Sequence, residues 1–159
     1  KNLIDKKINF EWTMVGFNSK KIKHIKGMEN YESNFNYINN IENLKEKFFP
    51  HSQLIEIFKK NHLYINLARI ESFGITIIEA LASELPVITF DTKGGNELIK
   101  NDFNGTVVKD ILPGTMADAI YKYYTSNDTY IKHKRNTKPS INQFDLNIVA
   151  EKSIKHYKI

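Results

Sequence analysis

The sequence predicts an α/β fold, namely an open, Rossmann-like sheet of parallel strands with helices on both faces. Strand-like segments alternate with segments of helical periodicity over residues 10–108, and the connections between them are short. The strand-like segments are largely apolar rather than strictly alternating, which is typical of parallel strands buried on both faces. The chain has 159 residues with no internal repeat and no linker, so we expect one domain.

The first half of the chain predicts a strand at each end with helical segments between them. Residues 10–16 are rich in β-branched and aromatic side chains and end at a glycine, which indicates a strand. Residues 19–37 are rich in Lys and Asn and predict a helix followed by a loop or short strand. From Pro50, helix-start residues and an apolar face predict a helix through Lys60, followed by a strand over residues 63–68.

The second half continues the alternation. A helix is expected over residues 74–83, a short buried strand over 86–90 and a helix from the Gly-Gly pair to residue 100. The Asn104-Gly105 pair predicts a turn that leads into a strand at residues 106–108. Two helices, over residues 113–124 and from 145 to the end, are expected to close the chain.

Charge and composition limit the function without deciding it. The net charge is +5, and the excess of positive charge lies mainly in residues 20–26 and 132–138. Such clusters suit an anionic partner, namely nucleic acid, an anionic membrane surface or a phosphate-bearing small molecule, but they could equally be a solvated lysine-rich surface. With no Cys, disulfides, thiolate metal sites and cysteine nucleophiles are excluded. The simplest expectation is a cytoplasmic protein whose membrane contact, if any, is peripheral, and a chain beginning on Lys suggests a fragment.

The loops at the carboxyl ends of the strands are the expected ligand site. Three of them follow Gly16, Ala68 and Phe90. The second leads into the helix that begins near Gly74, where free N–H groups and the positive end of the helix dipole would accept a phosphate. The free amides expected to meet this anion are those of Gly74, Ile75 and Thr76.

Two carboxylates flank this expected anion site. Glu71 lies in the loop before the helix, and Glu79 lies about five residues into it, roughly 7 Å along its axis. Carboxylates are strong acceptors for the vicinal hydroxyls of sugars and riboses, although both residues could also be ordinary acids at a helix start and on a helix surface. Gly94 and Gly95 have the same two interpretations, a close ligand approach or plain turn geometry.

The residues of this region resemble a known family. The segment from Glu71 to Val87 (ESFGITIIEALASELPV), the loop Gly94-Gly-Asn-Glu97 and the strand after Asn104 are similar to the C-terminal domain of retaining glycosyltransferases of the GT-B fold, family 4 or group 1 type. The good match covers residues 54–123. The chain has neither the dinucleotide fingerprint G-x-G-x-x-G nor a phosphate-binding P-loop, so a dehydrogenase or a P-loop kinase is disfavoured.

The resemblance implies a role for each residue of the motif. Glu71 would contact the donor sugar as the catalytic residue, with the backbone of Phe73 and Gly74 beside it, and Ser72 would also belong to the donor site. The amides around Ile75 and Thr76 would hold the phosphates, Glu79 would take the ribose hydroxyls, and Gly16, Gly94 and Gly95 would add loop contacts. The implied donor is a UDP-, GDP- or ADP-sugar, with no metal and no cofactor. The acceptor, a glycan or lipid-linked saccharide, would bind an N-terminal domain that this chain lacks, so the isolated fragment is expected to bind donor without transferring it.

The sequence departs from the family pattern at three places. Glu84 stands where the family usually has Gly at a helix end, and Leu67-Ala68 replaces Pro-Ser. The family's first strand, with its Gly-Arg and Lys-Gly, is not recognisable before Phe10. A sugar-nucleotide epimerase of the same fold and a non-catalytic nucleotide-binding or interaction domain therefore stay open as alternatives. Nucleic-acid binding is disfavoured because no aromatic motif lies among the basic clusters.

Overall fold

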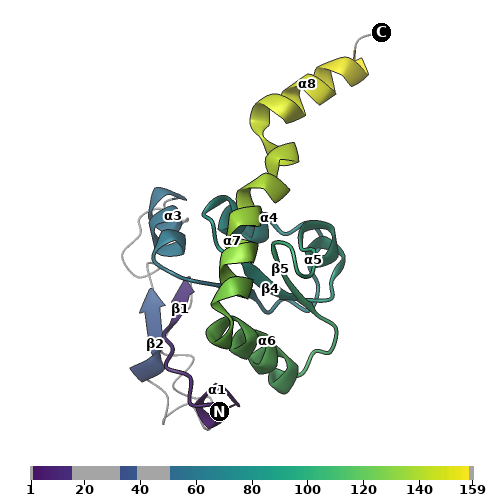
Figure 1. Ribbon diagram of the computed structural model, residues 1–159. Coiled ribbons are helices and arrows are strands. Elements are labelled where there is room, and N and C mark those ends of the chain that lie inside the picture. The colour runs from purple at the N-terminus through teal and green to yellow at the C-terminus, as the bar shows by residue number, and fades with distance from the viewer. Residues whose placement is uncertain (1, 16–32, 39–50, 158–159) are drawn as a thin grey trace.

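The fold of the protein was obtained as a computed structural model, which describes residues 2–15, 33–38 and 51–157 (Figure 1). The elements in chain order are α1 (Asn2–Asp5), β1 (Trp12–Val15), β2 (Phe35–Ile38), α3 (His51–Lys59), β3 (Tyr64–Asn66), α4 (Ile75–Ala82), β4 (Val87–Phe90), α5 (Lys93–Leu98), β5 (Gly105–Val108), α6 (Pro113–Thr125), α7 (Asn127–Ser140), the 3-10 helix η2 (Asn142–Phe144) and α8 (Leu146–Tyr157).

Both described sheets are parallel. Strands β3, β4 and β5 form one sheet in that order, and β1 pairs with β2 in a second. The register places Tyr64 opposite Val87 and Val87 opposite Gly105. Parallel neighbours require crossover connections, and α4 and α5 supply them in the three-stranded sheet. The α/β class and the parallel strands predicted from the sequence are confirmed.

Strand β4 shows how helices cover both faces of the three-stranded sheet. Val87 packs in a cluster with Ile77 and Leu81 of α4, whereas Ile88 and Phe90 pack in another with Met116 and Tyr123 of α6. Because alternate side chains of a strand point to opposite faces, α4 lies on one face and α6 on the other. All four β4 residues are buried, which explains the continuous apolar run in the sequence.

Helix α7 is an element that the sequence reasoning did not predict. Its buried residues are His133 and Thr137, which are polar, so residues 127–140 lack the apolar stripe that indicates a helix. The side chain of Ser126 caps it by accepting a hydrogen bond from the Thr129 amide. Pro139 is tolerated in its last turn. The helix α8 predicted from residue 145 is confirmed, and in Figure 1 it projects away from the remaining elements.

Two local expectations at the ends of elements can be compared with the structure. Glu84 has a φ of +64°, so the position that is usually Gly is indeed left-handed. The turn expected at the Asn-Gly pair ends one residue earlier than predicted, because Gly105 already belongs to β5. The Asn104 side chain is fully buried and donates to the Leu98 carbonyl oxygen over 2.9 Å. Gly16 and most of residues 19–37 lie outside the described residues, although β2 falls where a short strand was expected.

Candidate functional site

The loop between β3 and α4 holds Glu71 by both its backbone and its side chain. Buried Asn66, at the carboxyl end of β3, donates from its Nδ2 to Oε2 of Glu71 over 3.5 Å, and its Oδ1 accepts the Ala68 amide over 3.0 Å. The Glu71 carbonyl oxygen accepts the Gly94 amide from the neighbouring loop over 2.9 Å. The Glu71 carboxylate is half-buried beside the carboxyl end of the sheet.

The start of α4 provides hydrogen-bond donors that the described part of the protein does not use. Gly74 precedes the helix with a φ of +87°, a left-handed conformation that favours glycine, and no side chain caps the helix. The amides of Gly74, Ile75 and Thr76 take part in no hydrogen bond between described residues. Gly74 is buried, whereas Ile75 and Thr76 are exposed, so the amides of Ile75 and Thr76 can meet an anion from solvent.

Tyr64, on β3, contacts the first turn of α4. Its phenol donates to Oγ1 of Thr76 over 2.9 Å. Burial raises the pKa of Tyr64, the hydrogen bond to Thr76 lowers it, and the negative charges of Glu71 and Glu79 raise it further. Both glutamates, eight positions apart in the chain, thus act electrostatically on the same phenol.

Glu79 is held from the side of α3. Oε1 of Glu79 lies 3.5 Å from Nδ1 of His51, the first residue of α3. The Glu79 side chain is only 21% exposed, whereas that of His51 is 67% exposed, so the carboxylate is partly sheltered while the imidazole faces solvent. Glu79, the residue predicted to bind the ribose hydroxyls, therefore has a polar neighbour on α3.

The sequence reasoning missed Tyr64, Asn66 and His51. The first two are two positions apart on β3, so they lie on the same face of the strand. Two polar side chains on one face of an otherwise apolar strand could have indicated that this face contacts the site. His51 was interpreted only as part of a helix start, and no local pattern links it to α4. Its proximity to Glu79 is a property of the tertiary structure.

Gly94 and Gly95 have packing roles in the described structure. A Cβ on Gly94 would lie 2.9 Å from the backbone of Phe73, and a Cβ on Gly95 would lie 3.0 Å from the Phe90 carbonyl oxygen. The Gly94 amide is used by Glu71, and the Gly95 amide donates to Oγ1 of Thr92 over 3.1 Å. Their predicted contact with a ligand stays a prediction, as does that of Gly16, which lies outside the described residues.

The remaining motif residues, Ser72 and Phe73, are exposed in the loop before α4. The Phe73 ring meets the Phe144 ring of η2 edge to face, with centroids 5.8 Å apart. The described residues contain no group of acidic, His or Cys side chains that could hold a metal ion. Nor does any helix among them have the length and apolar character needed to cross a membrane.

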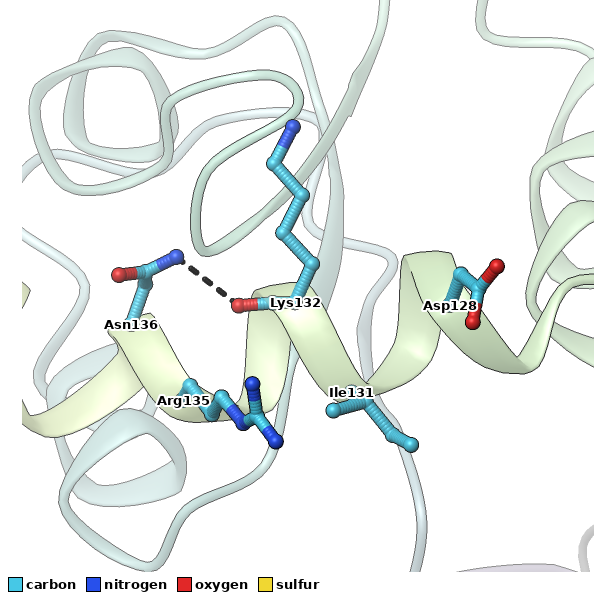
Figure 2. A pocket seen from close by; sticks show the side chains of 5 residues that line it. All are labelled: Asp128, Ile131, Lys132, Arg135 and Asn136. Carbon is cyan, nitrogen blue, oxygen red and sulfur yellow. Dashed lines mark hydrogen bonds between the residues drawn. The ribbon is translucent and has the colours of Figure 1, made fainter.

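A groove on α7 is separate from these loops. It is lined by five residues of that helix alone, and Figure 2 shows that the side chains of Lys132 and Arg135 extend in different directions without converging on a common point. Within the figure, Asn136 bonds to the Lys132 carbonyl oxygen of the same helix. The loops after β3 and β4 contribute nothing to its lining, so we place the candidate site at α4.

Comparison with known proteins decides the family. The profile described as "Glycosyl transferases group 1" matches residues 2–140, most of the chain. The chain belongs to the group 1 glycosyl transferases. A relative from Streptococcus parasanguinis is the GtfA subunit of a UDP-N-acetylglucosamine–peptide N-acetylglucosaminyltransferase. It is 35% identical over 83 residues, which cover 47% of this chain and 16% of that protein. The sucrose-phosphate synthase of Spinacia oleracea is 31% identical over 86 residues, covering 54% and 8% respectively.

Solved structures show that this group 1 glycosyl transferase chain has the fold of the family. A glycosyltransferase from Rickettsia africae matches with a TM-score of 0.79 at 23% identity over 99% of this chain and 42% of that one. The pneumococcal O-GlcNAc transferase GtfA, solved with UDP and GlcNAc, matches with a TM-score of 0.73 at 20% identity over 92% of this chain and 28% of that one. The chain thus spans less than half the length of these relatives.

Proposed function

We propose that this chain is the C-terminal, nucleotide-sugar-binding domain of a retaining glycosyltransferase. The observation that carries the proposal is the start of α4, where the amides of exposed Ile75 and Thr76 make no hydrogen bond to another described residue. Asn66 contacts the carboxylate of Glu71 in the loop before this helix, and His51 contacts that of Glu79 on the helix. Family membership supports it, and so do relatives whose structures were solved with UDP and a sugar. The whole protein would transfer a sugar from a UDP-, GDP- or ADP-sugar to a glycan or lipid-linked acceptor bound by a further, N-terminal domain.

The site suggests how each group would serve this reaction. Transfer breaks the bond between the anomeric carbon of the sugar and a phosphate oxygen, and the nucleoside diphosphate leaves with the electron pair. The amides at the start of α4 would stabilise the charge that develops on this leaving group without a metal ion. Glu71 would orient the sugar through its hydroxyls, and Glu79 would hold the ribose. The acceptor oxygen forms the new bond to the anomeric carbon, and its proton passes to the phosphate oxygen that leaves.

Calorimetric titration of the chain separates the two carboxylate roles. We expect Glu79→Gln to weaken binding of the nucleoside diphosphate and of its sugar conjugate alike, by about tenfold, because a charge-assisted hydrogen bond to the ribose is lost from both. We expect Glu71→Gln to leave the diphosphate affinity within about twofold and to weaken only the sugar conjugate, since only the sugar contacts Glu71.

The control is Glu151→Gln, an exposed carboxylate on α8 that makes none of these contacts. Its affinity for both ligands should equal that of the wild-type chain. If both glutamate variants weaken the diphosphate and the sugar conjugate equally, the assigned roles are wrong. If the wild-type chain binds none of UDP, GDP or ADP, the proposed function of this domain is contradicted.

A further inference from the structure

The Thr76 hydroxyl accepts a hydrogen bond from Tyr64 and keeps its own proton, which it can donate at the proposed anion site. Oγ1 of Thr76 accepts the phenol proton over 2.9 Å. A hydroxyl carries one proton of its own beside its acceptor lone pairs, so Thr76 still has a donor to offer. No other hydrogen bond between described residues uses this hydroxyl. Thr76 is exposed in the first turn of α4, next to the unused amides.

Tyr64 is held in place independently of this bond. Its ring meets the buried Phe58 ring of α3 edge to face, with centroids 5.6 Å apart, and its amide donates to the Pro86 carbonyl oxygen over 3.0 Å. Burial and the charges of Glu71 and Glu79 raise the pKa of Tyr64, so the phenol keeps its proton throughout the neutral range. The ring is therefore a fixed support that presents a permanent donor to Thr76.

We propose that Tyr64 is a positioning residue that makes the Thr76 hydroxyl a donor to a phosphate oxygen of the nucleoside diphosphate at the start of α4. This inference rests on the proposed function of that site. Phosphate oxygens only accept hydrogen bonds, so an O–H donor beside three amides complements them. Without the phenol, no hydrogen bond between described residues fixes the Thr76 hydroxyl, so its proton is free to rotate away from the phosphate.

The test is a double-mutant cycle measured by calorimetry with whichever of UDP, GDP and ADP the wild-type chain binds best. Tyr64→Phe keeps the ring and its contact with Phe58, and Thr76→Val keeps the shape of the exposed side chain without the hydroxyl. We expect each to weaken binding about three- to tenfold. The double variant should be no weaker than Thr76→Val alone, because the phenol acts through the hydroxyl.

Conservative and distant variants serve as controls. Thr76→Ser retains the hydroxyl and should keep wild-type affinity, and Tyr124→Phe, at an exposed position of α6, should change nothing. Unchanged affinity of Tyr64→Phe, or losses that add in the double variant, would overturn the inference while leaving the proposed function intact. If Tyr64→Phe does not fold, wild-type affinity of Thr76→Val overturns the inference by itself. Absence of nucleotide binding by the wild-type chain contradicts the proposed function and the inference together.

Discussion

Glu71 and Glu79 are supported by different neighbours, and this shows what residue types alone can predict. Both were predicted as site residues from their spacing and from the segment between them. Their supports, Asn66 for one and His51 for the other, come from elsewhere in the chain. A spacing can indicate that two carboxylates lie near one helix start, but it cannot indicate which other side chains hold them there, whether nearby in the chain as Asn66 is or distant as His51 is.

Gly94 gives a residue-scale prediction about the loop that carries Glu71. In Gly94→Ala the new Cβ would meet the Phe73 backbone at 2.9 Å, and backbone cannot move aside cheaply. We expect a loss of about 1–3 kcal/mol in the free energy of unfolding, measured by urea denaturation. Weaker nucleotide binding should accompany it, because the Glu71 carbonyl oxygen and the Gly94 amide would be pushed apart.

The matched control is Gly114→Ala in α6. A Cβ there would have only the Asn2 side chain nearby, at 3.7 Å. Alanine at a helical position without a clash should raise the free energy of unfolding by about 0.4–1 kcal/mol. Equal stability of the two variants would show that the close approach of Gly94 to Phe73 is not present in solution.

At the scale of elements, the segments that sequence reasoning predicted are those with an apolar pattern. β4 and α4 are buried through apolar side chains, and their places in the chain were predicted to within a residue or two. α7 packs on α4 and α6 but contributes polar His133 and Thr137 to the interior. The helical period of its buried face therefore does not appear in the pattern of apolar residues. A polar buried face is recognisable only once its hydrogen-bond partners are known.

The buried face of α7 predicts how stability depends on pH. His133 is 1% exposed, and its Nδ1 lies 2.7 Å from the Tyr123 hydroxyl. Burial lowers the pKa of His133, and the positive charges of Lys122 and Lys132 lower it further, while Asp102 acts in the opposite direction. The neutral imidazole can accept the proton of Tyr123, whose own pKa burial raises to about 12.

The direction of the effect follows from the depressed pKa. In the unfolded chain His133 takes up a proton near its ordinary pKa of about 6.5, whereas the folded chain resists protonation. Stability from this residue is therefore complete above pH 6.5 and is lost as the pH falls below it, by at most about 1.4 kcal/mol per pH unit. Urea denaturation between pH 7.5 and 5.5 should show a shallower slope for His133→Gln than for wild type.

His156→Gln is the control for this slope. The His156 side chain is exposed on α8, so its removal should leave the pH dependence of unfolding unchanged. A wild-type slope in His133→Gln would mean that the buried imidazole does not resist protonation.

At the scale of the whole molecule, the α/β class and the family could be predicted from the sequence because both depend on local patterns. The alternation of apolar strands and helices gave the class, and the segment from Glu71 to Val87 gave the family that the profile match confirms. The division of the described strands into two sheets could not be predicted, because strand pairing depends on contacts between distant segments. The catalytic role of Glu71 and the retaining mechanism stay predictions.

The measurement that tests the central claim most directly is a nuclear magnetic resonance titration of the wild-type chain with UDP, GDP and ADP. If the start of α4 holds the diphosphate, the amide signals of Gly74, Ile75 and Thr76 should shift most, with saturation on addition of one of the three nucleotides. Amides lining the α7 groove, such as those of Lys132 and Arg135, should not move. Shifts confined to α7, or none at residues 74–79 with any nucleotide, would contradict the account.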